Sequence, residues 1–235
     1  MKVVLVTGAT GGLGRVVVKL FLEAGETVAA VYRDEARFKE LVAYAGGERD
    51  TLRGFRADVT LETSIRGMVE AVVERYGRID ALLNLAGGYR GGADIAGTGE
   101  DDWNFLMLTN LKSAFLCSKA VLPVMMKAES GRIVFIAARP AVEKKGRTKA
   151  GAYAVSKAGV VTLTEAIAEE GRKFNIAANC LLPGTIDTPG NRVNLPAADF
   201  SKWTRPQDIA SVLLFLVSEA ALIVSGASIP VYGKS

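Results

Sequence analysis

Histidine is absent from the 235 residues of this chain. The absence excludes a histidine general base and a Ser-His-Asp triad, and it removes the commonest protein ligand of transition metals. No metal site is therefore predicted. Any proton transfer has to come from tyrosine, lysine or a carboxylate, so tyrosine and lysine side chains held close together are the candidates for acid-base chemistry.

Cysteine is scarce, and long apolar runs are missing. Cys117 and Cys180 have apolar neighbours and lack the spacing of a metal or redox pair, which indicates small core residues in a reducing compartment. No apolar run reaches about 18 residues, the length that spans a membrane. Met1 and Lys2 lead directly into an apolar run, which leaves no room for a signal peptide. We expect a cytoplasmic protein without a membrane partner.

Charge of neither sign is concentrated in one part of the chain. The net charge of +4 comes from 29 basic and 25 acidic residues spread along its length. This diffuse excess suits an anionic cofactor but does not predict binding of nucleic acid. Hydrophobic residues make up 49% of the chain, and no linker, repeat or low-complexity tract divides it. We therefore expect a single domain over residues 1–235.

A glycine-rich turn follows the first apolar run. Residues 3–6 have the composition of a buried strand, and apolar residues recur at helical spacing over residues 13–20. Gly8, Gly12 and Gly14 lie at this junction. In this order the free N–H groups and the dipole of the helix start can bind phosphate, and glycine lets a pyrophosphate approach the backbone. A plain tight turn is the alternative, but the order strand, turn, helix favours a dinucleotide site.

The end of the second predicted strand indicates which dinucleotide is bound. An acid at this place binds the ribose 2′-hydroxyl of NAD, whereas an arginine accommodates the 2′-phosphate of NADP. Here Tyr32 is followed by Arg33 and Asp34. Arg33 could also be a solvated surface residue, and Asp34 could be a helix N-cap. We expect NADP as the cofactor, with NAD less favoured.

Seven strand-like segments alternate with helical patterns, which predicts a doubly wound, Rossmann-type α/β fold with a seven-stranded parallel sheet. The predicted strands are residues 3–6, 27–31, 52–58, 80–86, 132–137, 177–182 and 228–231. Ligands of such a sheet bind beyond the carboxyl ends of its strands. Residues 1–90 are expected mainly to bind the cofactor, and residues 100–235 to carry the catalytic groups and the substrate. Taken singly, Asp58 could be a helix N-cap and Gly87-Gly88 a plain turn.

Two predicted helices, residues 101–126 and 153–174, are apolar on more sides than one sheet can cover. We therefore expect a homo-oligomer. Pro123 is expected to kink the first of these helices or to end it early. Asn110 lies within the same helix among apolar residues, where it must find hydrogen-bond partners. It could be a satisfied core amide or part of a site.

Tyr153 and Lys157 are four residues apart, one helical turn along one face. The spacing lets the lysine ammonium stabilise a tyrosine phenolate and lower the pKa of Tyr153 toward the working pH, although such pairs are common by chance. The preceding residues 139–151 are predicted to form a solvated basic loop, with an anion-binding lid as the alternative. Residues 204–207 are predicted to form a capping box that starts a late helix.

These motifs together resemble the short-chain dehydrogenase/reductase family over nearly the whole chain. The resemblance is carried by Thr7-Gly8-x-x-x-Gly12-x-Gly14, Asp58-Val59, Asn84-Leu85-Ala86-Gly87, Asn110, Tyr153-x-x-x-Lys157 and Pro183-Gly184-x-Ile186-x-Thr188. It implies that Tyr153 exchanges the substrate proton, that Lys157 holds the nicotinamide ribose and acidifies this tyrosine, and that Asn110 supports a water relay. It also implies a tetramer or dimer built on the two apolar helices. The expected cofactor-binding residues are Gly8, Thr10, Gly11, Gly12, Leu13, Gly14, Arg33, Asp58, Val59, Asn84, Ala86, Gly87, Tyr153, Lys157, Pro183, Gly184, Ile186 and Thr188.

One position departs from the family pattern. The strand before the catalytic loop usually ends in a serine that holds the substrate carbonyl, whereas Ala138 stands there in this chain. Thr148, the nearest hydroxyl of the loop, is expected to be misplaced. The dihydropteridine reductases, a branch with the Tyr/Lys pair but without this serine, are similar in this respect.

The expected function is therefore that of an NAD(P)-dependent oxidoreductase. It would transfer hydride between nicotinamide and a small substrate, either a carbonyl or carbinol compound or an imine or quinone-like one. Because Ala138 replaces the serine, a nucleotide-binding protein with weak or no turnover is the alternative.

Overall fold

Seven parallel strands form one sheet in the order β3-β2-β1-β4-β5-β6-β7 in the computed structural model, which describes residues 1–234. The strands are β1 (Val3–Thr7), β2 (Thr27–Tyr32), β3 (Leu52–Arg56), β4 (Ala81–Asn84), β5 (Gly131–Ile136), β6 (Ile176–Pro183) and β7 (Ser228–Val231). The inner strands are buried almost throughout, which is why they show continuous apolar runs in the sequence. The doubly wound, seven-stranded parallel sheet is thus confirmed.

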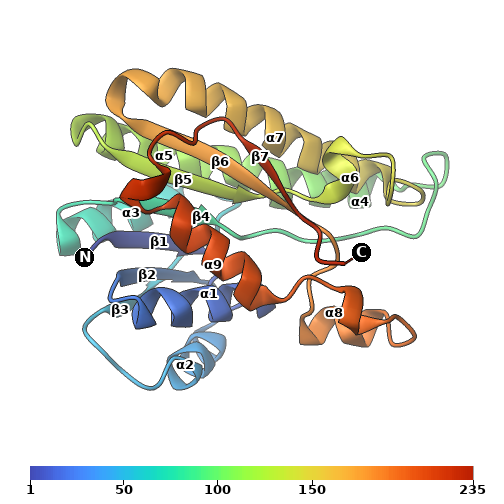
Figure 1. Ribbon diagram of the computed structural model, residues 1–235, viewed down its shortest axis with the longest axis horizontal. Coiled ribbons are helices and arrows are strands. Elements are labelled where there is room, and N and C mark those ends of the chain that lie inside the picture. The colour runs from blue at the N-terminus through green and yellow to red at the C-terminus, as the bar shows by residue number, and fades with distance from the viewer. Residues whose placement is uncertain (235) are drawn as a thin grey trace.

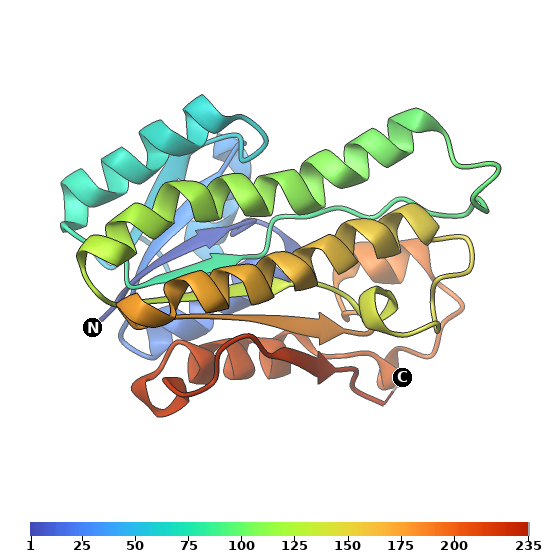
Figure 2. The same ribbon diagram turned by 90° about the horizontal axis from the view of Figure 1, so that it is seen from above.

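Helices cover both faces of the sheet (Figure 1). One face carries α1 (Gly12–Glu23), α2 (Glu35–Tyr44) and α9 (Pro206–Leu216), and the other carries α3 (Glu62–Tyr76), α5 (Ser113–Lys127) and α7 (Gly151–Gly171). Figure 2 shows α3, α5 and α7 running side by side. The β1 side chains alternate between two hydrophobic clusters, since Leu5 belongs to one and Val4 and Val6 to the other.

The long apolar helix is continuous, but its backbone hydrogen-bonding pattern changes from α-helical to π-helical and back. It consists of α4 (Glu100–Leu106), a π-helical segment over Met107–Lys112, and α5. The prediction that Pro123 ends it early is wrong, because α5 continues to Lys127. Pro123 and Lys119, whose carbonyl loses its N–H partner, are both exposed, so water can hydrogen-bond this carbonyl and the cost of proline is reduced.

By length and composition, residues 100–127 would also suffice to cross a membrane, and 44% of the apolar window is buried. The helix contains no uninterrupted apolar run of about 18 residues, because Asn110, Lys112 and Lys119 lie within it. A core helix of a globular protein has the same length and hydropathy, and this one packs against α3 and α7.

Several short elements occupy the predicted loops: α6 (Arg139–Val142), α8 (Pro189–Asn194), and 3-10 turns at Arg172–Phe174, Phe200–Lys202 and Glu219–Ala221. The predicted capping box at residues 204–207 is wrong. The Thr204 hydroxyl donates to the Val231 carbonyl (2.9 Å) and makes no cap for α9. A long-range contact to the end of β7 thus replaces the local cap and holds the last strand against the segment before α9.

Candidate active site

The predicted site residues lie where strands end at one edge of the sheet, together with the first turn of α1 and parts of two helices. Thr10, Gly11 and Leu13 lie at the β1–α1 junction, Val59 follows β3, Ala86 follows β4, and Pro183, Gly184 and Ile186 end or follow β6. The strand order switches between β1 and β4 at this edge, and doubly wound sheets bind nucleotides beyond the strand ends at such a switch.

The glycines after β1 fit closely against the ends of other strands. Gly8 has φ +65°, and a Cβ atom there would lie 2.8 Å from the Ala86 backbone nitrogen. At Gly12 a Cβ atom would lie 2.8 Å from the Thr188 Cβ, and at Gly14 it would overlap the Gly8 carbonyl oxygen. Glycine is therefore required for this packing. The exposed Gly11 and the uncapped start of α1 leave backbone N–H groups for an anion, so the turn fits a dinucleotide.

The end of β4 is joined to the end of β1 by side chains. The Thr7 hydroxyl donates to Asn84 Oδ1 (3.0 Å) and accepts from the Ala86 backbone N–H (3.2 Å). Asn84 is 3% exposed, and its Nδ2 finds no acceptor within residues 1–234. Asn84 therefore joins β4 to β1, while its Nδ2 keeps an unused donor. A buried donor without a partner costs free energy and is uncommon at purely structural positions.

The residues that follow β2 and β3 decide whether Asp34 and Asp58 are helix N-caps, an alternative that the sequence left open. Asp34 caps α2 by accepting from the Ala36 N–H (2.8 Å) and the Arg37 N–H (3.3 Å), which confirms its reading as an N-cap. Arg33 is exposed at the end of β2. Asp58 is not the cap of α3, because that position is Leu61.

Asp58 instead accepts hydrogen bonds from Thr60, from the backbone N–H (2.9 Å) and the hydroxyl (2.6 Å). These bonds hold the pKa of Asp58 below its usual value. The side chain thus shapes the turn after β3 and keeps its charge at neutral pH.

Asn110 is a fully bonded core amide that also connects two parts of the candidate site. It lies in the π-helical segment, is 1% exposed, and exchanges hydrogen bonds with the Gly88 backbone, accepting at 2.8 Å and donating at 3.0 Å. Its Nδ2 also donates to the Ser156 hydroxyl (3.0 Å), which donates in turn to the Tyr153 carbonyl (2.8 Å). The interpretation of Asn110 as a satisfied core amide is confirmed. Its role in a functional site stays a prediction, although π-helical insertions often mark such sites.

Lys157 and Tyr153 lie on α7 beside this network. Lys157 is 5% exposed, and its ammonium donates to the Ile136 carbonyl (2.7 Å). A Cβ atom at Gly87 would lie 2.9 Å from Asn110 Oδ1 and 3.3 Å from Lys157 Nζ. Asn110 and Lys157 thus converge on Gly87, with Tyr153 one turn before Lys157 on the same helix.

The predicted lowering of the Tyr153 pKa is wrong for the chain alone. Burial raises the pKa of Tyr153, and Tyr89 raises it further. Burial also lowers the pKa of Lys157 to about 8, because an ammonium is poorly solvated there. The ammonium donates one hydrogen bond to Ile136, and within residues 1–234 no hydrogen bond joins it to the Tyr153 hydroxyl; its other N–H groups stay available.

Ala138 is 4% exposed and lies two residues after the end of β5, in the N-cap position of α6. Thr148 is exposed in the loop after α6.

Two residues of the candidate site, Ser156 and Tyr89, were not predicted from the sequence. Ser156 bridges Asn110 and Tyr153, and Tyr89 packs edge-on against the Tyr153 ring, with ring centroids 5.0 Å apart. The only signal for Tyr89 is an aromatic residue directly after the Gly87-Gly88 turn.

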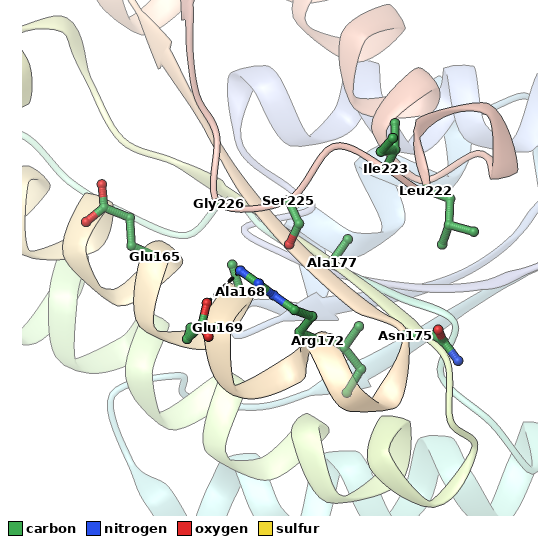
Figure 3. Close-up of a pocket in the computed structure, with 11 residues that line it drawn as sticks. Glu165, Ala168, Glu169, Arg172, Asn175, Ala177, Leu222, Ile223, Ser225 and Gly226 are labelled. Atoms are coloured by element: carbon green, nitrogen blue, oxygen red, sulfur yellow. Dashed lines mark hydrogen bonds and ion pairs between the residues drawn. The ribbon is translucent and has the colours of Figure 1, made fainter.

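A cavity of about 380 Å³ lies elsewhere, between the end of α7, the start of β6 and the segment before β7 (Figure 3). Arg172 at its edge pairs with Glu169 (2.6 Å), and the exposed Leu222 and Ile223 lie opposite. Because it lies at the amino end of β6, this cavity belongs to the edge of the sheet away from the candidate active site.

Comparisons with known proteins show the family to which the chain belongs. The sequence model of the family described as short chain dehydrogenase matches residues 2–198. The 3-oxoacyl-(acyl-carrier-protein) reductase FabG of Thermotoga maritima is 34% identical over 99% of this chain and 96% of its own length. BbsD of Thauera aromatica, a subunit of a hydroxy(phenyl)methylsuccinyl-CoA dehydrogenase, is 34% identical over 99% and 95%.

Solved structures resemble the whole fold. ElxO with NADP bound superposes with a TM-score of 0.92 at 25% identity, covering 99% of this chain and 97% of that one. A variant of the actinorhodin polyketide ketoreductase with NADPH gives a TM-score of 0.87 at 32% identity, covering 99% and 96%.

Proposed function

Because the chain belongs to the short-chain dehydrogenase family, we propose that it is an NADP-preferring reductase of small carbonyl, imine or quinone-like compounds. The observation that carries the proposal is the convergence of Asn110 and Lys157 on Gly87 beside Tyr153, next to a glycine turn that fits a dinucleotide. The NADP-bound neighbour supports the cofactor. The decisive experiment is the Tyr153→Phe variant described in the Discussion.

A bound nicotinamide would supply a hydride, that is, two electrons and one hydrogen for the substrate carbon. In the proposed reaction the phenol of Tyr153 gives its proton to the substrate oxygen as the π electrons of the C=O bond move onto that oxygen. The Lys157 ammonium stabilises the tyrosinate that is left. Asn110 and Ser156 fix the backbone of Tyr153, and Asn110 supports the water relay that returns a proton to it. Oxidation runs through the same groups in reverse.

Arg33 is proposed to select NADPH. A guanidinium bound to the 2′-phosphate contributes roughly 1.5–3 kcal/mol, which is about tenfold or more in affinity. Asp34 is engaged by α2 and so does not compete for a ribose hydroxyl. In fluorescence titrations we expect NADPH to bind at least tenfold more tightly than NADH, and Arg33→Ala to remove this difference. Arg37→Ala, an exposed arginine on α2, is the control; equal or tighter binding of NADH by the unmodified protein would refute the assignment.

A homo-oligomer, either a tetramer or a dimer, is proposed from the outer faces of the long helices. Trp103, Phe115 and Val155 are 42%, 48% and 48% exposed there, although aromatic and branched side chains usually bury most of their surface. Light scattering at micromolar concentration should give a multiple of the chain mass. Phe115→Asp should shift the protein to a smaller species, whereas Leu61→Asp, at another exposed apolar residue, should not. A monomeric unmodified protein would show the proposal wrong.

A nucleotide-binding protein with little or no turnover is the second candidate. It is favoured by Ala138, which leaves the substrate oxygen one hydroxyl donor short. In either case we propose a small-molecule ligand, no nucleic-acid partner and a cytoplasmic location. The location is supported by Cys117 and Cys180, which are both free and buried.

A further inference from the structure

Tyr89 places an aromatic ring next to the proton donor. It follows β4 on the same edge of the sheet, and its ring meets the Tyr153 ring edge-on, with centroids 5.0 Å apart and planes at 76°. Tyr89 is nevertheless 64% exposed. One side of the residue therefore packs on the Tyr153 ring, and most of its surface is open to solvent and to a ligand bound beside Tyr153.

The Tyr89 ring is held in place by its loop. The Tyr89 hydroxyl lies close over Gly91, where a Cβ atom would overlap the hydroxyl oxygen and lie 2.9 Å from the Lys149 carbonyl oxygen. The Gly92 N–H donates to the Lys149 carbonyl oxygen (2.7 Å). This bond joins the Tyr89 loop to the loop that precedes α7. The loop that carries Tyr89 is thus joined to the start of α7, and the Tyr89 ring lies edge-on against Tyr153.

The polar groups around the Tyr153 hydroxyl are few. Ala138 stands where the family pattern has a serine, so this position offers no hydroxyl donor, and Thr148 is exposed in the loop. With a single donor, an isolated ketone develops negative charge on an oxygen that is poorly stabilised. A conjugated carbonyl or imine spreads this charge over its ring system and needs the second donor less. The same ring system is flat and stacks on an aromatic side chain.

We infer that Tyr89 is a specificity-determining residue, and that the substrates of this site are flat, conjugated carbonyl or imine compounds of the quinone and quinonoid-heterocycle class. This inference rests on the proposed reductase function, because it concerns what lies against Tyr153 during proton transfer. Flexible aliphatic ketones would gain little from Tyr89 and would suffer most from Ala138.

Two vicinal diones that differ in flatness test the inference. NADPH-dependent reduction of 9,10-phenanthrenequinone and of butane-2,3-dione is measured without oxygen, with the enzyme-free rate subtracted. For the unmodified protein we expect the higher kcat/KM with phenanthrenequinone. Tyr89→Leu should lower the ratio of the two kcat/KM values about three- to tenfold, mainly through KM for the quinone. Tyr89→Phe keeps the ring and should keep the ratio.

Tyr44→Leu is the matched control, since Tyr44 is an exposed tyrosine on α2, away from Tyr153, and it should leave the ratio unchanged. If Tyr89→Leu lowers kcat/KM equally for both diones or changes it for neither, Tyr89 only shields Tyr153 from solvent and the inference is wrong. Tyr153→Phe is measured in parallel with both diones. If that variant turns over normally, the proposed function itself fails, whereas its loss of activity combined with an unchanged ratio in Tyr89→Leu rejects the inference alone.

Discussion

Tyr153→Phe is expected to lower kcat for carbonyl reduction by about 10²–10⁴, the usual contribution of a positioned general acid, while NADPH still binds. The substitution removes only the hydroxyl. The ring remains available to pack against Tyr89, and Ser156 still donates to the backbone carbonyl at position 153. Steady-state rates with several substrates, together with a fluorescence titration of NADPH, measure the two effects separately.

Tyr76→Phe is the matched control for this variant. Tyr76 lies on α3, and its hydroxyl is buried without a hydrogen-bond partner within the described residues 1–234, so losing it should not affect turnover. If Tyr153→Phe keeps the activity of the unmodified protein, the site does not run the proposed acid-base chemistry. The nucleotide-binding alternative would then be preferred.

Ala138→Ser is expected to raise kcat/KM for simple ketones at least several-fold. The upper bound is about 10²–10³, the loss in rate when such a donor is removed from other enzymes. Position 138 is the N-cap of α6, and Arg139 and Pro140 follow it. Because Pro140 has no N–H, a serine side chain at position 138 would accept from the Ala141 N–H. A serine oxygen that accepts from this N–H keeps its own proton free to donate to the substrate oxygen.

The same cap gives Ala138→Ser a second, independent readout. A serine N-cap is expected to stabilise the folded protein by about 1 kcal/mol over alanine, which a thermal melt detects. Ala138→Gly, which adds no hydroxyl, is the control for rate. If the serine variant is stabilised but its ketone reduction is unchanged, the hydroxyl caps α6 without reaching the substrate, and the predicted role of position 138 is wrong.

Much of the fold follows from local patterns. The central strands are buried and mostly apolar because helices cover both faces, so their positions and parallel arrangement can be predicted from the sequence. The glycine turn is also predictable. Close packing allows no side chain at Gly8, Gly12 and Gly14, so the spacing of these glycines can be recognised in the sequence. Strand ends were predicted within a few residues, as at β4, which is shorter than the predicted segment 80–86.

Other features depend on contacts between distant segments. The hydroxyl of Thr204 is taken by Val231, which no local motif shows, and the π-helical turn at Asn110 has the same apolar pattern as an α-helix. The direction of the Tyr153 pKa follows from burial and from Tyr89, both set by tertiary packing. The helical spacing of Tyr153 and Lys157 correctly places them one turn apart, but it does not reveal that the ammonium binds Ile136.

Transfer of deuterium tests the central claim most directly. The unmodified protein and Tyr153→Phe are incubated with NADPH deuterated at the reactive nicotinamide carbon and with butane-2,3-dione, and the product alcohol is analysed by mass spectrometry. The account predicts one deuterium on the product carbon for each NADPH oxidised, with product formation lost in Tyr153→Phe. Equal deuterated product from both proteins, or NADPH binding with no turnover of either butane-2,3-dione or 9,10-phenanthrenequinone, would contradict it.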